Sequence, residues 1–178
     1  MNWRTKDFDY ELPAELIAAR PAERRDGSRM MVVDRSSGKV EHRSFADFGG
    51  YVRKGDLCVL NDTRVVRSRF FSDDGKVELV RTRLLGERLW KAMVRPGKRM
   101  KAGREVVVGG VRGVVIEVAE DGERVIEWEG EVGDECGALA LPHYMERDAE
   151  EVDEERYQTV YAKQPGAIAA PTAGLHFT

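Results

Sequence analysis

Four consecutive polar residues form the first group whose types could do chemistry. They read NDTR and are Asn61, Asp62, Thr63 and Arg64. They follow an apolar run, and the Arg64 guanidinium can hold a phosphate or carboxylate through two parallel hydrogen bonds. Open α/β sheets bind their ligands at such strand ends. The stretch therefore predicts one wall of a binding site, although an Asx turn is the simpler interpretation of the same residues.

A second candidate is the stretch 164–178, which contains no Asp, Glu, Lys or Arg. A frayed tail would be polar, and a buried strand would not contain two prolines and two glycines within ten residues. Small residues let the backbone approach a ligand closely, and His176 can exchange a proton near neutral pH. We therefore expect a ligand loop here, with His176 as the candidate proton-transfer residue.

The charges of the chain are segregated along the sequence. Charged residues make up 34% of the chain and give a net charge of −3. Residues 95–104 have five basic side chains and no acidic one, whereas residues 146–156 have seven acidic side chains and two arginines. A solvated loop and an exposed helix start would explain both runs. The basic run is also compatible with nucleic acid, because phosphates respond to the local field. Its basic residues are Arg95, Lys98, Arg99, Lys101 and Arg104.

Other classes of site lack their usual patterns. Cys58 and Cys136 lie far apart, which is neither a disulfide framework nor a CxxC site, and Cys58 is predicted to be a buried, inert thiol. His42, His143 and His176 are equally scattered, so no metal site is predicted. No phosphate-binding glycine motif precedes a predicted helix. No apolar run has membrane-spanning length and no signal peptide is evident, so we expect a cytoplasmic protein without membrane contact.

The first third of the chain predicts a mixture of short helices and strands. Residues 12–20 predict a short helix with a proline in its first turn. Residues 29–34 and 39–43 predict a β-hairpin, and Ser44 can cap a brief helix over 45–52. Leu57–Leu60 predicts a buried strand that runs into the NDTR turn.

The residue pattern changes in the middle of the chain. From Val65 to about Gly130, short valine-rich segments are separated by turn signals at roughly ten-residue spacing, which predicts a small antiparallel β-barrel. Its clearest hairpin has Asp121-Gly122 at the tip. An extended connection follows, and residues 153–163 predict a helix that ends before Pro165. We therefore predict an α/β domain, here incomplete, interrupted by an inserted small antiparallel β-barrel, with residues 1–64 and 151–178 in the first and 65–150 in the second.

Five stretches together resemble one known family. They are FDYELPAELIAARPAERRDGSRMMVVDR, GDLCVLNDTRVVRSRF, LPHYMERD, RYQTVYA and GAIAAPTAGLHFT. In this order they resemble the S-adenosylmethionine:tRNA ribosyltransferase-isomerases of queuosine synthesis. The resemblance covers almost the whole chain, and YQTVYA followed closely by AAPTAGLHF is its most specific part.

The resemblance implies a fold and a reaction. The fold is a large α/β domain interrupted by a small β-barrel. The reaction moves and isomerises the ribosyl group of S-adenosylmethionine onto 7-aminomethyl-7-deazaguanine at the tRNA wobble position, giving epoxyqueuosine-tRNA, adenine and methionine. It implies S-adenosylmethionine as co-substrate, no metal, and tRNA as partner. Proton transfers at the sulfonium side and at the departing adenine suit a neutral histidine.

The resemblance also suggests roles for the candidate residues. NDTR would form one wall of the site, and the other would consist of Tyr157, Gln158, Thr172, Gly174 and His176. The basic residues of 95–104 would contact tRNA phosphates without reading sequence.

Two departures from the family pattern matter. LPHY stands where a double proline is usual, which weakens a rigid turn. The family also continues beyond PTAGLHFT, so this chain is expected to correspond to about the first half of the enzyme, and a separate chain could supply the rest. The alternative is a truncated, non-catalytic β-barrel module that binds RNA.

Overall fold

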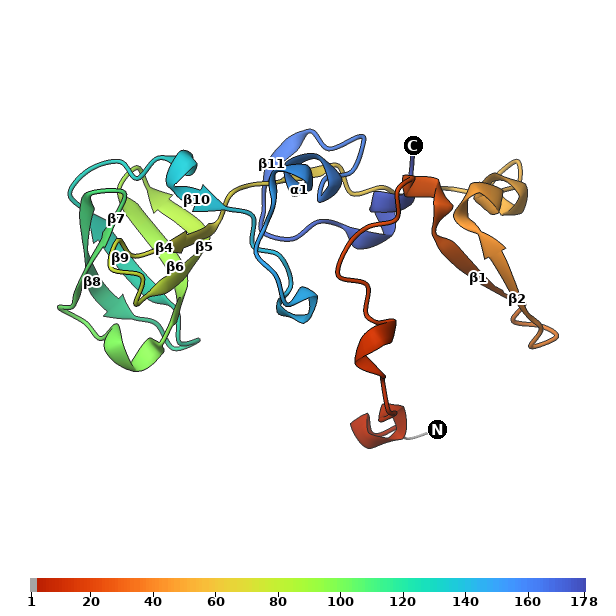
Figure 1. Ribbon diagram of the computed structural model, residues 1–178, viewed down its shortest axis with the longest axis horizontal. Helices are drawn as coiled ribbons and strands as arrows, with labels where there is room; N and C mark the ends of the chain where they lie inside the picture. Colours follow the sequence, from red (N-terminus) through yellow and green to blue (C-terminus); the bar gives the residue numbers. More distant parts are fainter. Residues whose placement is uncertain (1–2) are drawn as a thin grey trace.

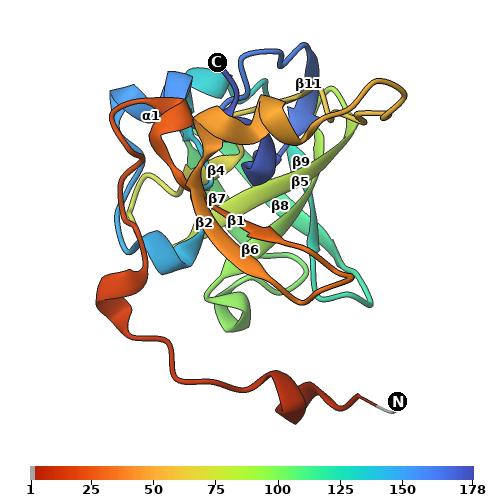
Figure 2. The same cartoon turned by 90° about the vertical axis from the view of Figure 1, so that its right-hand side faces the viewer.

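The computed structural model describes residues 3–178. In Figure 1 a curled sheet occupies one end of the molecule, and the hairpin of β1 (Arg29–Val33) and β2 (Val40–Ser44) occupies the other. The helix α1 (Glu151–Arg156) and the strand β11 (Gln164–Ala167) lie between them. Figures 1 and 2 show the segment before residue 20 running away from the body of the protein.

The curled sheet contains seven strands, each antiparallel to its neighbours. Their order across the sheet is β10-β4-β5-β6-β9-β8-β7. The strands are β4 (Arg69–Phe71), β5 (Glu78–Gly86), β6 (Leu89–Arg95), β7 (Glu105–Val108), β8 (Val111–Val118), β9 (Arg124–Trp128) and β10 (Gly137–Ala138). The short 3₁₀ helices η5 (Gly97–Arg99) and η6 (Asp134–Cys136) lie in its connections.

The inner face of this sheet holds the main hydrophobic core. Burial alternates along β6 and β7, as a strand with one covered face requires. Phe70, Trp90 and Trp128 lie in a row with neighbouring ring centroids 4.8 Å apart, and Leu79 and Ile126 are fully buried beside them. Such aromatic contacts add to the stabilisation from buried area.

The predicted antiparallel barrel is confirmed as a curled sheet but not as a closed one. The β8–β9 hairpin forms as predicted, and Asp121 accepts a hydrogen bond from the Glu123 amide at its tip. Strands β7 and β10 are edges, however, and do not pair with one another. A loop borders β7 instead: the Asp73 amide donates to the Val107 carbonyl, and the Asp73 carboxylate accepts the amides at the β7–β8 turn. The sheet is therefore a half-barrel.

The N-terminal segment confirms some predictions and corrects one. The hairpin forms from β1 (Arg29–Val33) and β2 (Val40–Ser44) as predicted. Ser44 occupies the predicted N-cap position of the 3₁₀ helix η4 (Phe45–Tyr51), but its hydroxyl donates to the Asp26 carbonyl, and its amide donates to the Asp47 carboxylate. The helix predicted over 12–20 is wrong. Between residue 3 and β1 only the 3₁₀ turns η1 (Thr5–Phe8), η2 (Ala14–Leu16) and η3 (Arg25–Gly27) form. The apolar face of that segment has nothing to pack against, and Leu16 is 70% exposed.

The predicted strand Leu57–Leu60 is also wrong. These residues form no regular secondary structure, and Leu57 and Val59 are 87% and 84% exposed. Cys58 is exposed with them, which corrects the prediction of a buried thiol. An apolar run predicts burial only when another element covers it, and no described element does so here.

After the half-barrel the chain returns through η7 (His143–Met145) to the single α-helix of the described residues, α1 (Glu151–Arg156). The prediction of a helix up to residue 163 is wrong, because the Tyr157 amide closes the last turn on Asp153 and a new turn follows at Thr159–Ala162. The chain then enters β11 (Gln164–Ala167), which pairs in parallel with β3 (Thr63–Val65), and ends in η8 (Thr172–His176). The assignment of these flanking segments to an α/β domain stays a prediction.

A second, smaller core joins the segments on either side of the half-barrel. Val65 packs with Leu139, Leu141, Tyr157 and Ala170. The buried carboxylate of Asp153 forms an ion pair with Arg147 at 2.6 Å. In Figure 1 this core lies around α1 and β11, between the half-barrel and the β1–β2 hairpin.

Gln158 fastens this core to β3 through its side-chain amide. The Val65 amide donates to Gln158 Oε1 at 2.9 Å, and Gln158 Nε2 donates to the Val65 carbonyl at 2.8 Å. Both residues are buried. The Gln158 side-chain amide therefore takes the place of a backbone amide on a neighbouring strand. It pairs with the buried N–H and C=O groups of Val65, which would otherwise lack hydrogen bonds.

Replacing Gln158 with Ala should therefore destabilise the fold. Each Val65 backbone group that is left buried without a partner costs about 1–3 kcal/mol. The check is the free energy of unfolding from urea titration. Gln164→Ala is the matched control, because that residue is exposed. Equal stability of the two variants would contradict a structural role for the Gln158 amide.

Candidate functional site: an arginine-lined cavity

A cavity of about 390 Å³ lies where η3 and the start of β1 face α1 and η8. We call it the arginine cavity, because five arginines contribute to its wall. They are Arg20, Arg24, Arg25, Arg29 and Arg156. A cavity of this size can hold a nucleotide-sized ligand.

Three of the sequence-predicted site residues line this cavity. Tyr157 lies at its base after α1, and Thr172 and His176 come from η8. The terminal stretch and the stretch after α1 therefore do converge on one site. Gln158 and Gly174 do not line the cavity. The Gln158 side chain forms hydrogen bonds with the Val65 backbone, and Gly174 is buried in η8.

The NDTR residues do not line the arginine cavity. Asn61 Oδ1 accepts the Thr63 amide at 3.0 Å, which is the Asx turn of the simpler interpretation. The Asp62 carbonyl accepts the amides of Lys163 and Gln164 and so starts the β3–β11 pair. Arg64 is exposed opposite Pro165. In this structure the two predicted walls are thus separate.

Arg25 ties the N-terminal segment to the C-terminal one. Its Nη1 donates to the Gln158 carbonyl at 2.8 Å and to the Leu175 carbonyl at 3.2 Å, and its Nη2 donates to the Glu155 carbonyl at 2.8 Å. The last carbonyls of α1 have no partner within the helix, so a cation there also meets the negative end of the helix dipole. Arg25 therefore positions α1 and η8 around the cavity.

Arg156 makes the reciprocal connection. It extends from α1 and donates to the Ala22 carbonyl at 2.7 Å and to the Glu23 carbonyl at 3.0 Å. Its Nε is buried and has no hydrogen-bond partner among the described residues. The two arginines thus hold their guanidinium groups in fixed positions through backbone carbonyls, which are uncharged.

The cavity wall carries an excess of positive charge. Arg20 forms an ion pair with Glu150, and Arg24 forms one with Asp26. By contrast, Arg25, Arg29 and Arg156 are not in ion-pair contact with any carboxylate of residues 3–178. Burial and the neighbouring Arg156 lower the pKa of Arg25, against a weaker opposite effect of Glu155. None of these three charges therefore has an ion-pair partner among residues 3–178, and Arg25 receives only the weaker compensation from Glu155.

The remaining functional groups are held by aromatic contacts and burial. The His176 ring lies against Phe45 with centroids 5.2 Å apart, and Phe177 packs edge-on against Phe45 and Phe48. The Tyr157 hydroxyl is buried without a hydrogen bond of normal geometry to any residue of 3–178. Burial raises the pKa of this hydroxyl, while the nearby Ala170 amide acts weakly in the opposite direction.

Sequence reasoning missed the five arginines of the cavity. The signal was present, since Arg20, Arg24, Arg25 and Arg29 fall within ten residues of one another. Spacing alone did not show that they face a fifth arginine more than a hundred residues later. Only the fold brings Arg156 to them.

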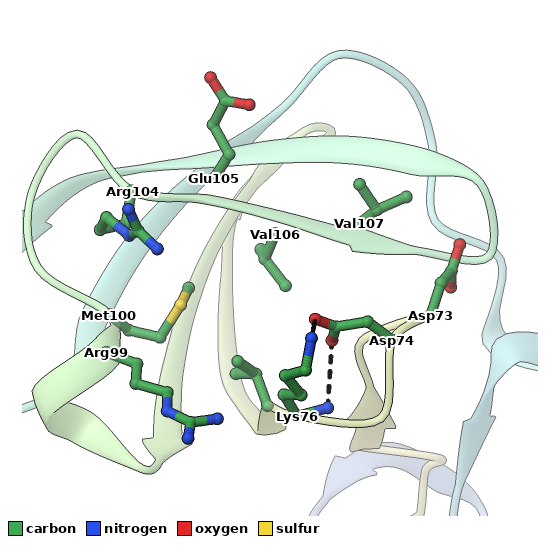
Figure 3. A pocket seen from close by; sticks show the side chains of 10 residues that line it. Asp73, Asp74, Lys76, Arg99, Met100, Arg104, Glu105, Val106 and Val107 are labelled. Carbon is green, nitrogen blue, oxygen red and sulfur yellow. Dashed lines mark hydrogen bonds and ion pairs between the residues drawn. The ribbon is translucent and has the colours of Figure 1, made fainter.

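The predicted basic patch lies away from this cavity, on the half-barrel between β6 and β7. We call residues 95–104 the basic loop; its five basic residues are all exposed. Arg124 holds the loop by donating to the carbonyls of Gly97 at 2.7 Å and Met100 at 2.8 Å. A hollow of about 680 Å³ lies beside the loop, and Arg99 and Arg104 line it. Figure 3 shows these two side chains with the other residues of its wall.

That hollow is not uniformly basic. Asp74 pairs with Lys76 within the turn at one side of the hollow, and hydrogen bonds from Ser72, followed by those from Lys76, lower the pKa of Asp74 to about 2. The Asp73 carboxylate already accepts hydrogen bonds from the Gly109 and Gly110 amides of the β7–β8 turn. Arg99 and Arg104 are therefore its free cations among the described residues.

Residues 3–178 contain neither a metal-binding cluster nor a membrane-spanning helix. No group of three or more of their His, Cys, Asp or Glu side chains is arranged to hold a metal ion. No helix of this part of the chain has the length and apolar character needed to cross a membrane.

The position of η8 beside the cavity should depend on the missing side chain of Gly174. A Cβ atom there would come within 2.3 Å of the Tyr161 hydroxyl and 2.9 Å of Thr159 Cγ2. Gly174→Ala should therefore lower the stability by about 1–3 kcal/mol through overpacking. The melting temperature checks this, with Gly49→Ala as control because its Cβ would meet open space. Equal melting temperatures would show that η8 adapts freely.

Comparison with known proteins places the chain in a family. The family described as queuosine biosynthesis protein matches residues 5–178. The S-adenosylmethionine:tRNA ribosyltransferase-isomerase of Syntrophomonas wolfei is 45% identical over 99% of this chain and 53% of its own length, and that of Acetivibrio thermocellus is 43% identical over 98% and 54%. A crystal structure of S-adenosylmethionine tRNA ribosyltransferase from Thermotoga maritima is 37% identical over 79% of this chain and 52% of that one, with a TM-score of 0.39.

The chain thus spans about half the length of the curated relatives that it matches. Within that half, the match runs through the NDTR turn, the half-barrel, α1 and η8 without leaving out any of the candidate residues. By this match the chain belongs to the family of queuosine biosynthesis proteins.

Proposed function

We propose that the protein carrying this chain is an S-adenosylmethionine:tRNA ribosyltransferase-isomerase. The observation that carries the proposal is the family match over residues 5–178, together with relatives of that name at 41–45% identity over nearly the whole chain. The reaction transfers and isomerises the ribosyl group of S-adenosylmethionine onto 7-aminomethyl-7-deazaguanine in tRNA. Its products are epoxyqueuosine-tRNA, adenine and methionine.

The chemistry of this reaction sets requirements that the arginine cavity meets in part. A proton must leave carbon next to the sulfonium, the amine of the acceptor base must be neutral, and adenine must be protonated as it departs. His176 at the cavity wall is the proposed proton-transfer group, because imidazole is the side chain most often used as a general acid or base and the Phe45 ring packs against it. Tyr157 and Thr172 offer hydroxyls beside it.

The remaining predicted residues have supporting roles in the proposal. Gln158 and Gly174 position the wall through their contacts with Val65 and Tyr161. NDTR forms a separate surface at β3. We propose that it joins the site when the rest of the polypeptide is present, and that Arg64 then contacts substrate.

We also propose the domain division 1–64, 65–150 and 151–178, in which the outer two parts belong to one α/β domain. The parallel β3–β11 pair supports this, because it joins residues from both outer parts across the whole half-barrel. The exposed Leu57–Leu60 segment and the apolar side chains Met31 and Val33 of the hairpin supply surface that such a domain would cover.

Release of adenine and methionine tests the proposed function. The assay mixes the protein with S-adenosylmethionine and tRNA that carries 7-aminomethyl-7-deazaguanine, with and without a second polypeptide corresponding to the other half of the relatives. We expect stoichiometric adenine and epoxyqueuosine-tRNA when both halves are present. RNA binding without any adenine release under both conditions would instead favour a non-catalytic RNA-binding module.

In the active protein, His176→Gln should lower kcat by roughly 10²–10⁴-fold, the usual contribution of a general acid or base. KM for S-adenosylmethionine should change much less. His143→Gln is the matched control, since His143 is exposed in η7 and does not line the arginine cavity. Similar kinetics for both variants would remove His176 from the mechanism.

The basic loop should neutralise phosphates of bound tRNA. Reversing both charges, with Lys98→Glu and Arg99→Glu, should weaken tRNA binding and reduce the slope of log K against log salt by about one for each phosphate that is no longer neutralised. The same reversal at Arg53 and Lys54, an exposed basic pair elsewhere, is the control. If both double variants keep the slope of the unchanged protein, the loop is only solvated surface.

A further inference from the structure

We propose that the arginine cavity binds a phosphodiester group of the RNA substrate together with the nucleotide that carries it. The inference rests on the proposed function only in taking RNA as the substrate. It assigns a second RNA-binding surface, beside α1 and η8 and away from the basic loop of the half-barrel.

The charge of the cavity is the first argument. Arg25, Arg29 and Arg156 face it without a carboxylate of residues 3–178 in ion-pair contact. Partly buried charges that lack a partner are costly, and here two of them also repel each other. An anion placed between these guanidinium groups removes both penalties at once.

The chemistry of the two substrates decides which one supplies the anion. S-adenosylmethionine carries a sulfonium and an ammonium group beside its one carboxylate, so it brings two positive charges into any site. The cavity offers one lining carboxylate among the described residues, Asp153, and Arg147 already pairs with it at 2.6 Å. A phosphodiester brings a negative charge and no positive one. The arginine side of the cavity, formed by Arg25, Arg29 and Arg156, therefore suits the RNA backbone, and the sulfonium of S-adenosylmethionine would lie away from it, near His176.

The hydrogen-bond donors give a second, independent argument. Arg156 Nε is buried without a hydrogen-bond partner in the described part of the chain, and the Tyr157 hydroxyl is buried with only the nearby Ala170 amide beside it; both residues line the cavity. Tyr157 is only 5% exposed. Arg25 and Arg156 are already fixed by backbone carbonyls, so a ligand would not have to order them. Phosphate oxygens accept charge-assisted hydrogen bonds from such donors.

The size of the cavity and the apolar part of its wall indicate a ligand that is larger than a free phosphate ion. The volume of about 390 Å³ leaves room beside a phosphate, and Tyr144, which is 57% exposed, lines the same cavity. Exposed aromatic rings beside cationic grooves stack unpaired bases of RNA. We therefore assign Tyr144 as the platform for the base of that nucleotide.

Arg29→Gln tests the assignment, because Arg29 is exposed at the start of β1 and its replacement leaves the two bracing arginines in place. The probe is a fluorescently labelled RNA stem–loop with the anticodon sequence, titrated by anisotropy over a range of salt concentrations. We expect several-fold weaker binding and a salt slope reduced by about one. Tyr144→Leu should weaken binding without changing the slope.

Arg35→Gln is the matched control. Arg35 lies in the turn of the same hairpin, beyond Val33, and is exposed, so its replacement removes the same charge away from the cavity. Its slope should equal that of the unchanged protein. Equal slopes for the Arg29 and Arg35 variants, or no RNA binding by the unchanged protein, would overturn the proposal.

A competition with S-adenosylmethionine separates the two sources of anion. We expect millimolar inorganic phosphate to displace the RNA from the unchanged protein more effectively than from the Arg29 variant, and S-adenosylmethionine to displace it from neither. Displacement by S-adenosylmethionine that requires Arg29 would assign the cavity to its carboxylate and refute the proposal. Adenine release is measured separately, so a failure of the proposed function is not confused with a failure of this one.

Discussion

The crossed hydrogen bonds of Arg25 and Arg156 connect the parts of this structure that are farthest apart in sequence. Arg25 donates to three carbonyls between Glu155 and Leu175, and Arg156 donates to two carbonyls just before Arg25. Backbone carbonyls have partial charges only, so they fix a guanidinium without neutralising it. The same hydrogen bonds that hold the N-terminal segment against α1 and η8 therefore leave a basic cavity between them.

The half-barrel is stabilised in a different way. Its core of Phe70, Trp90 and Trp128 depends on buried apolar area and aromatic contacts, and its strands satisfy one another's backbone groups. It therefore needs little from its surroundings and can carry the basic loop at its outer end, held by Arg124. The half-barrel is joined to the second, smaller core around Val65. The Gln158 side-chain amide and the Arg147–Asp153 ion pair stabilise that core.

The outer segments depend on packing that the described residues supply only in part. Leu57 and Val59 lie open to solvent although their side chains are those of a buried strand. Relatives of this chain are about twice as long, and the match covers one half of them. Apolar side chains gain free energy only where another surface covers them. The same sequence pattern therefore gives a well-defined core in the half-barrel and none at Leu57–Leu60.

The sequence by itself determined the local features: the β1–β2 hairpin, Ser44 at a helix N-cap position, the Asp121-Gly122 hairpin and the antiparallel character of the middle segment. Each follows from turn chemistry or from alternation along a few neighbouring residues. It also indicated the family through YQTVYA and AAPTAGLHF. Only the tertiary structure decided that Leu57–Leu60 is uncovered, that the NDTR turn lies apart from His176, and that Arg156 meets the arginines of residues 20–29. Those outcomes depend on interactions between residues more than a hundred positions apart, and local propensity contains no information about them.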